Sequence, residues 1–456
     1  MHKLAVAVAG AIVAALLGSP VLAQDTDSRS PVPAATTSPE ATLHWWTALN
    51  DPVLTGLIQQ GLEANHDIVQ AHARIRRSQA LLAGARAAFG PGGSVGLQGR
   101  AAQASEAEAP GLTRAQRRGD SVQAGLDFSW EVDLFGRLDN QAAAASQRVR
   151  ATEAQLRGIR LAISAEIANA YFALIGAREQ LQLARTVAAN RERTLRLVSA
   201  RASGGAVAPI DEIRARADLE AALAQVPLHA APARVASHRI AVLTAQSPAG
   251  FELPTTGTIE PAAIAIRVPA GETWLANRPD VQEQEAELQA RALDIKAVRA
   301  EFYPRLTISG VLGFVAGSVA SLGTAGSVSW LSAPSLLAPL FDRPKIEARL
   351  AAAKANQKEL LAAYQQRLLL ATEEVENALA RYTFGQQQFQ ALQRRAQLAV
   401  EAERLSRVRY EAGAADLLEL LDTQRTAQQA QAELAAALSD QRQRLVAVFK
   451  GIGAGA

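Results

Sequence analysis

The chain is an approximate duplication of one unit, and this repeat restricts its possible folds more than any other feature of the sequence. Four pairs of similar segments occur in the same order in the two halves. They are Asn65–Ile68 with Arg278–Val281, Arg86–Pro91 with Arg299–Pro304, Asp133–Arg137 with Pro339–Arg343, and Gly205–Ile210 with Gly413–Leu418. The first two pairs share an offset of 213 residues (278 − 65 and 299 − 86). We therefore expect one succession of elements to occur twice.

The sequence predicts six regions along the chain. They are a signal peptide at 1–23, an N-terminal extended segment at 24–52, a first structural repeat at 53–245, a linker at 246–272, a second structural repeat at 273–450, and a C-terminal tail at 451–456. Four prolines, from Pro248 to Pro269, indicate the linker. The first region has a basic start at Lys3, an uncharged run over Leu4–Pro20 and a small-residue cleavage site at Ala23. Its apolar run is shorter than the roughly 20 residues of a membrane-spanning helix.

The composition excludes several classes of protein. The chain contains no cysteine, so disulfides, thiol chemistry and a lipid anchor on an N-terminal cysteine are not expected. The formal net charge of +3 becomes +2 (3 − 1) when Lys3 leaves with the signal peptide. A chain so close to neutral shows no preference for a polyanionic partner, and we expect no nucleic-acid binding.

The clearest strand pattern lies between Ser121 and Asp133. Every second residue from Val122 to Val132 is apolar, and the residues between them are polar or glycine. A period of two places the two sets on opposite faces of a sheet. The length of about 11 residues suits a tilted transmembrane strand. A second alternation, from Val95 to Ala101, precedes it.

The second half repeats this pattern over Leu306–Phe314 and again near Val328–Trp330. No charged residue lies between Arg305 and Asp342, so a helical transmembrane hairpin is an alternative. Several glycines and prolines in this stretch disfavour a helix interior. The matching segment of the first half alternates with period two. We therefore predict four strands per chain.

Long helices are predicted over about 139–203 and 344–411, preceded in the first half by a helix over 53–89. A helix of ~65 residues is a rod of roughly 100 Å, which must pack along a partner in a coiled-coil arrangement. The partner helices are expected to start near 207 and 414. Hairpin turns are expected between each pair, at Ser203, Gly204 and Gly205 and at Ala412 and Gly413.

Four strands cannot form a membrane barrel alone. An open sheet edge in a bilayer leaves backbone groups unpaired, each at a cost of several kcal/mol. We therefore predict a trimer that shares one 12-stranded transmembrane β-barrel, with strands joined outside the cell near 102–120 and 316–327. The polar residues Gln123, Asp127, Ser129 and Glu131 are expected to face its lumen. The predicted fold class is mainly α with membrane β, with the barrel continuing into a long α-helical periplasmic barrel.

Several motifs in this order resemble the TolC-type outer-membrane efflux channel family. They are Trp45-Trp46, Asp51–Leu54, Asp133–Arg137, Arg278–Val281, Phe302–Pro304, Arg409–Gly413 and Leu421–Arg425. The resemblance covers nearly the whole mature chain. It implies a homotrimer in the outer membrane that works with a periplasmic adaptor protein and an inner-membrane pump of the resistance-nodulation-division type. Members of this subgroup often carry a lipidated cysteine after the signal peptide, which this chain lacks.

The resemblance also implies a periplasmic gate where the last helix pair narrows. Our hypothesis is that Asp416, with Glu419 and Leu417, lines the closed tip, and that Arg409 or Arg407 holds it shut. A ring of three aspartates would favour cations. The alternative is that these charges belong to a solvated helix end and interact with the helix dipole. The turn residues Ser203–Gly205, Ala412 and Gly413 are expected to form adaptor-docking tips, although a helix-capping role explains the glycines as well.

No enzymatic, cofactor-binding or metal-binding pattern emerges from the sequence. The six histidines show no metal-ligand spacing, and the glycine-rich segments do not precede helices that could hold phosphate. We therefore expect a conduit for small molecules such as drugs. Two alternatives remain: a type I protein-secretion channel of the same architecture, and a periplasmic coiled-coil scaffold without a pore.

Overall fold

The computed structural model describes residues 44–253 and 272–454, all within the unit Glu40–Ala456. The predicted signal peptide, most of the N-terminal segment and most of the linker lie outside the described residues. The strands are β1 Gly92–Gln103, β2 Arg118–Val132, β3 Arg305–Ala316 and β4 Val328–Leu337. The α-helices are α2 Pro52–Ala64, α3 His66–Ala87, α4 Arg137–Ser203, α5 Pro209–Leu243, α6 Pro279–Ala300, α7 Arg343–Glu411 and α8 Leu417–Gly451. Short 3-10 helices are η1 Trp45–Leu49, η2 Glu272–Asn277, η3 Val319–Ser321 and η4 Ala325–Ser327.

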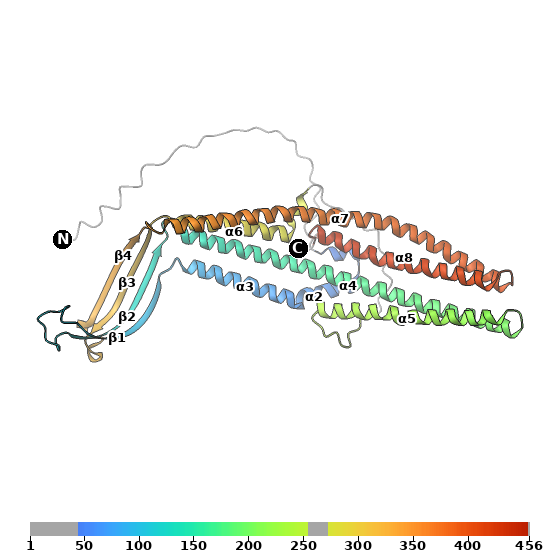
Figure 1. Cartoon of the computed structure of the whole chain (residues 1–456), viewed down its shortest axis with the longest axis horizontal. Coiled ribbons are helices and arrows are strands. Elements are labelled where there is room, and N and C mark those ends of the chain that lie inside the picture. The colour runs from blue at the N-terminus through green and yellow to red at the C-terminus, as the bar shows by residue number, and fades with distance from the viewer. Residues whose placement is uncertain (1–43, 254–271, 455–456) are drawn as a thin grey trace, which may run out of the picture. The chain divides into compact units, whose positions relative to one another are not determined.

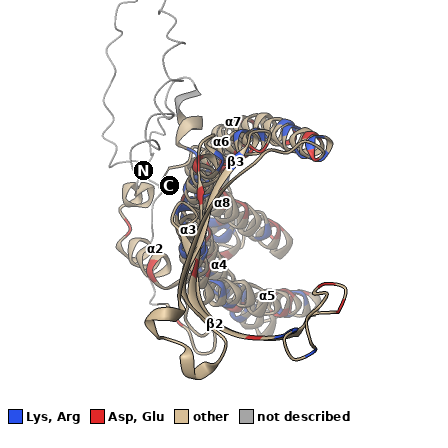
Figure 2. Cartoon of the chain, turned by 90° about the vertical axis from the view of Figure 1, so that its left-hand side faces the viewer, with Lys and Arg blue, Asp and Glu red and all other residues tan. Residues whose placement is uncertain are grey.

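The four strands form one antiparallel sheet in the order β1-β2-β3-β4 (Figure 1). Each half supplies one hairpin, and β2 pairs with β3 to join the two halves. The helices leave the sheet at one end and reach the hairpin turns at the other (Figure 1). The predicted duplication is therefore confirmed, because the same series occurs twice: a helix, two strands, a long helix and a return helix that runs back from the hairpin turn. The return helices are α5 and α8. Charged residues are dense on the helices and sparse on the strands (Figure 2).

Two details of the N-terminal part differ from the prediction. The expected single helix over 53–89 is two helices, because Asn65 has an extended backbone and its side chain caps α3 by accepting from the Asp67 amide at 2.8 Å. The segment before it is not extended at its described end. Trp45 and Trp46 lie in η1 and are both 2% exposed. They pack into the core beside α4, and the burial of their apolar surface stabilises this short helix relative to an extended backbone.

The expected tail after residue 450 is also wrong in part. Helix α8 continues through Gly451, and Ala454 is buried in the same core cluster as the two tryptophans. The end of the chain therefore closes the core near the middle of the long helices.

Helix α4 is the centre of the helical part. It contacts α2, α3, α5, α6 and α8, whereas α7 contacts mainly α6 and α8. Its middle section contributes the buried core residues Ile167, Tyr171 and Phe172. A stretch of α4 is apolar and long enough to cross a bilayer, but 61% of it is buried inside the structure, so we assign it to this core. A side chain at Gly61 of α2 would collide with Ile167, which explains the glycine there.

The two hairpin turns have the same backbone. Gly205 and Gly413 have φ values of 71° and 76°, in the left-handed region that favours glycine. The amide after each glycine donates back into its long helix, from Ala206 to Arg201 at 2.9 Å and from Ala414 to Arg409 at 2.8 Å. This is the Schellman type of helix end, so the capping explanation of these glycines is supported.

Candidate functional site

The sheet has one apolar and one mostly polar face, and its register fixes which residues share each face. One row across all four strands is Leu97, Ala124, Phe314 and Val328. The next row toward the helices on that face is Val95, Leu126, Leu312 and Trp330. Such rows suit contact with lipid. The four residues predicted for the lumen are alternate residues of β2 and lie together on the opposite face.

The two carboxylates among these four residues have different surroundings. Glu131 forms a bidentate ion pair with Arg137 at the start of α4, with distances of 2.9 and 2.8 Å. Within the described residues, no ion pair involves Asp127. Asp127 instead lies opposite Ser94 in β1 and Val311 in β3. On β2, therefore, only Asp127 gives the mostly polar face a negative charge without an ion-pair partner.

The connection from β2 to α4 explains the motif Asp133–Arg137. The Asp133 carboxylate accepts from the amides of Arg137 at 2.7 Å and Asp139 at 2.8 Å, which satisfies the first turn of α4. Phe135 stacks on Tyr303, with ring centroids 4.7 Å apart. The two halves are therefore tied together where the sheet meets the helices.

The outer strands β1 and β4 each have one strand neighbour within the chain. Their free edges carry unpaired backbone donors and acceptors, which lipid cannot satisfy. The chain must therefore complete its hydrogen bonding with other copies when the sheet enters a bilayer.

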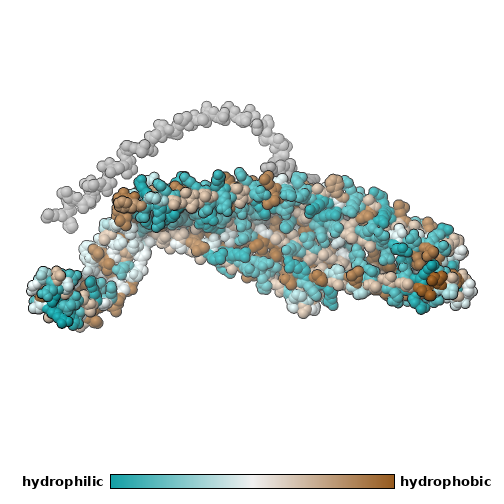
Figure 3. Space-filling view, in the orientation of Figure 1, coloured by the Kyte–Doolittle hydropathy of each residue, from teal (hydrophilic) through white to brown (hydrophobic). Residues whose placement is uncertain are grey.

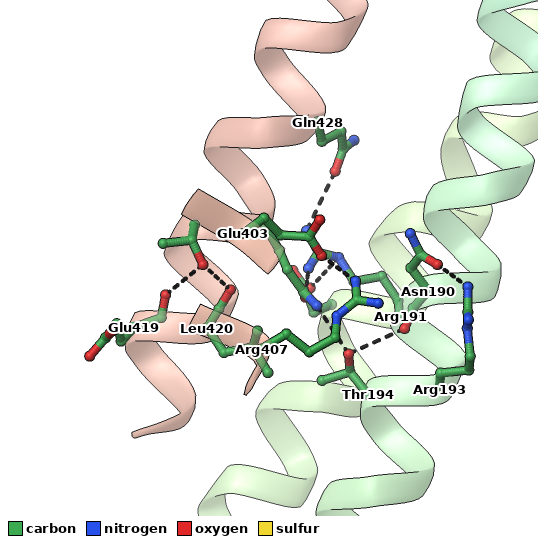
Figure 4. A network of polar contacts seen from close by, with 12 residues as sticks. Asn190, Arg191, Arg193, Thr194, Glu403, Arg407, Glu419, Leu420 and Gln428 are labelled. Atoms are coloured by element: carbon green, nitrogen blue, oxygen red, sulfur yellow. Dashed lines mark hydrogen bonds and ion pairs between the residues drawn. The ribbon is translucent and has the colours of Figure 1, made fainter. Parts of the chain in front are cut away.

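At the hairpin tip, three of the five predicted gate residues lie together. The Asp416 carboxylate caps α8 by accepting from the Glu419 amide at 2.7 Å. Arg409 forms an ion pair with Glu419 at 2.7 Å and donates to the carbonyl of Ala414. Arg407 does not join them, because it pairs with Glu403 within α7 (Figure 4). Leu417 is 4% exposed and belongs to a small core cluster.

The two predicted docking turns are held to each other. Arg201, just before Ser203–Gly205, donates to the carbonyl of Glu411 at 2.9 Å and lies over the ring of Tyr410 at 4.6 Å. Ser203 donates to the carbonyl of Ala200 at 2.9 Å. The turns at Gly205 and Gly413 therefore form one paired end of the helices.

A buried arginine above the tip was missed by the sequence reasoning. Arg191 of α4 lies between the helices (Figure 4) and is 4% exposed. It pairs with Asp218 of α5 at 2.8 Å and donates to Gln424 of α8. Burial lowers the pKa of this guanidinium, and the charges of Asp218 and Glu403 offset part of that effect. The signal was present, because Arg191 follows the buried Val187 by four residues and precedes the buried Thr194 and Val198 by three and seven.

No cluster of three or more potential metal ligands occurs in the described parts of the chain. The sequence profile of the family described as "Outer membrane efflux protein" matches residues 57–246 and 271–454. The chain belongs to this outer membrane efflux protein family.

Relatives of this efflux protein match along nearly its whole length. Nodulation protein T of Rhizobium leguminosarum bv. trifolii is 31% identical over 90% of this chain and 87% of its own. Outer membrane protein OprJ of Pseudomonas aeruginosa is 30% identical over 91% of this chain and 86% of its own. The structure of the outer-membrane channel OprN superposes with a TM-score of 0.84 at 31% identity, covering 94% of this chain and 98% of that one.

The predicted architecture and role are confirmed by these relationships. The efflux protein is the outer-membrane component of a three-part efflux system, a homotrimer whose shared β-barrel continues into a periplasmic helical barrel. It works with a periplasmic adaptor and an inner-membrane pump. The family consists of channel proteins, and a scaffold without a pore is thereby set aside.

Proposed function

We propose that this efflux protein is a passive exit duct for small molecules and performs no catalysis itself. The observation that carries the proposal is the four-stranded sheet with one lipid-compatible face, one mostly polar face and two open edges. Closing three such sheets produces a cylinder that needs no substrate-binding chemistry to conduct. Relatives such as the toluene efflux pump outer membrane protein TtgF of Pseudomonas putida favour small-molecule export over the type I protein-secretion alternative.

In this proposal the barrel lumen is lined by Gln123, Asp127, Ser129 and Glu131 together with their register partners. Their position on the face opposite Leu126 and Phe128 supports this orientation. The paired turns at Ser203–Gly205 and Ala412–Gly413 are the end of the helices that docks the adaptor. Their exposure at the far end from the sheet supports that role (Figure 1).

The proposed gate consists of Asp416, Glu419 and Arg409 from each of three copies. Within one chain Arg409 neutralises Glu419, while the capping carboxylate of Asp416 retains a charge that can face the threefold axis. The proposal assigns Leu417 to packing behind the gate, and Arg407 to holding α7 through Glu403.

Planar-bilayer recordings of the purified trimer test the pore and the gate. Stable single channels are expected from the wild type, and their absence from a folded trimer would reject the duct. Asp416→Asn removes the charge but keeps a good cap, whereas Asp416→Ala removes both at a cost of about 1 kcal/mol. A changed conductance in Asp416→Asn supports the ring of charges. If Asp416→Asn has the wild-type conductance and only Asp416→Ala alters gating, Asp416 acts purely as a structural helix cap.

A further inference from the structure

A hollow of about 520 Å³ lies on the face of the sheet that we propose lines the lumen. Its polar side chains are Ser94, Asp127, Ser129 and Ser309, and its apolar ones include Val311 and Leu331. These residues are near the start of β1 and the end of β2, the end of the sheet from which α3 and α4 extend. The hollow therefore lies where the helical tunnel opens into the barrel.

A row without bulky side chains borders the hollow. Gly96, Gly125, Gly313 and Ser329 face one another across all four strands. A Cβ at Gly313 would come within 2.3 Å of the Ala124 carbonyl oxygen, so the strands approach too closely there for a side chain. A Cβ at Gly96 would lie 3.8 Å from Asp127 Oδ2, which places this carboxylate beside the bare row. Nothing on this row shields Asp127 from the lumen.

The charge of Asp127 stands apart from the other charges of the sheet. Glu131 is neutralised by Arg137, and Asp120 pairs with Arg118 at 3.3 Å near the far end of β2. Arg100 and Arg305 share the face, but each is six residues along its strand from a register partner of Asp127, Ser94 in β1 and Val311 in β3, or roughly 20 Å. On the other side of Asp127, Val311 and Leu331 are 39% and 60% exposed.

We propose that this hollow is a transit site for amphiphilic organic monocations, which the Asp127 carboxylate and the apolar pair Val311 and Leu331 hold together. The inference rests on the proposed lumen orientation. In the trimer it gives three equivalent sites around the barrel entrance. A cation with an apolar body can interact with both the carboxylate and the apolar side chains of the hollow. An anion is repelled by the carboxylate, and a small inorganic cation makes no use of the apolar side chains. The hollow is open, so occupancy is brief and export continues.

Current block in planar bilayers tests the site directly. Tetraalkylammonium ions from tetraethyl to tetrapentyl are added to the barrel side of single reconstituted trimers. Block is expected to strengthen with chain length, by up to about fourfold per methylene that becomes buried. Asp127→Asn should weaken block by tetrapentylammonium at least tenfold. The matched control Asp120→Asn removes the same charge from the same strand, on the opposite face. This variant should be blocked by tetrapentylammonium as strongly as the wild type.

Two further variants separate the components of the site. Ser94→Lys places a cation opposite Asp127 and should abolish block. This variant tests the site independently if Asp127→Asn fails to assemble. Leu331→Ser should keep block by the smallest ion and flatten the dependence on chain length. Conducting trimers that show no block, or equal block in Asp127→Asn or Ser94→Lys, overturn the site and leave the duct intact. A folded wild-type trimer that never conducts instead overturns the proposed duct.

Discussion

Helices α4 and α7 are copies of the same element, yet the chain uses them differently. They have 67 and 69 residues, but 24 residues of α4 are buried and only eight of α7. Large apolar side chains stay exposed along α7, among them Leu369 at 68%, Phe384 at 68% and Leu398 at 73%. Brown apolar surface is interspersed with polar surface along the helices (Figure 3). Helix α4 therefore completes the core of one chain, and we expect the exposed apolar side chains of α7 to pack against neighbouring copies in the trimer.

The two halves also differ in the hydrogen bond that holds the end of the helix returning from each hairpin turn, α5 in the first half and α8 in the second. Asn65 and Arg278 are equivalent in the repeat, and each donates to the carbonyl at the last residue of a return helix, Leu243 in α5 and Gly451 in α8. The first half uses a neutral amide. The second half uses a buried guanidinium that also pairs with Asp280 and Glu374, each at 2.8 Å. The position of the bond was kept while its chemistry changed.

The largest effect is expected from Arg278→Ala. Its removal leaves two carboxylates and a buried carbonyl without their partner, and breaking a buried pair in this way costs about 3–5 kcal/mol. Urea unfolding of the purified trimer, followed by circular dichroism at 222 nm, measures the loss. Arg367→Ala is the matched control, because this more exposed arginine also pairs with Asp280 but donates to no helix end. Equal losses in the two variants would contradict the central role of Arg278.

A slightly smaller effect is expected from Ile167→Ala in α4. Ile167 is fully buried, and truncation of a core isoleucine costs about 2–5 kcal/mol. Leu369→Ala in α7 provides the comparison. It should leave the helical unfolding midpoint nearly unchanged and instead lower the temperature at which trimers dissociate on semi-native gels. If Leu369→Ala lowers the unfolding midpoint as much as Ile167→Ala does, α7 belongs to the core of a single chain.

Asn65→Ala is expected to cost about 1–2 kcal/mol, less than Arg278→Ala, because it removes a neutral cap and a neutral hydrogen bond. The same urea series measures it. Asn65→Asp is an informative partner, since it keeps the cap on α3 and loses the donation to Leu243. A loss in Asn65→Asp as large as in Asn65→Ala would assign the stabilisation to the bond with α5.

The smallest effect is expected from pH, with opposite signs at two carboxyls. Burial works against it, but the hydrogen bond from Arg278 holds the pKa of Asp280 below its ordinary value. That stabilisation is present above the ordinary pKa and is lost as pH falls through the lowered one. Burial raises the pKa of Glu283, and the charges of Glu287 and Asp280 add to it. Its contribution is complete at low pH and is lost as pH rises through the raised value.

Glu283→Gln isolates this effect, because the repeat places Gln70 at the equivalent position of the first half (283 − 213). The variant should gain about 0.5 kcal/mol at pH 7, the size of a surface charge interaction, and the gain should disappear near pH 4. The free energy of unfolding, measured across this range, checks the sign. A gain that grows as pH falls would exclude repulsion at Glu283 as its cause.

Much of the fold could be predicted because it follows from local periodicity. The alternation from Val122 to Val132 specified a strand and its two faces. The uninterrupted helical segments and Gly205 and Gly413 specified two long hairpins. The break at Asn65 was missed, because a capping asparagine within an apolar helical pattern gives only a weak signal. For the proposed gate, the sequence predicted a charged tip but not the different roles of its residues, since only the structure shows that Asp416 caps α8 and that Leu417 is buried.

The sequence by itself determined the types of element, their duplication and the two-faced sheet, because these depend on residues a few positions apart. Only the tertiary structure decided the strand register that aligns Gly96, Gly125 and Gly313, the burial of Arg191, and the bond from Arg278 to Gly451. Those features join residues tens to hundreds of positions apart. Their partners are selected by packing and by the need to pair every buried polar group, which no local pattern records.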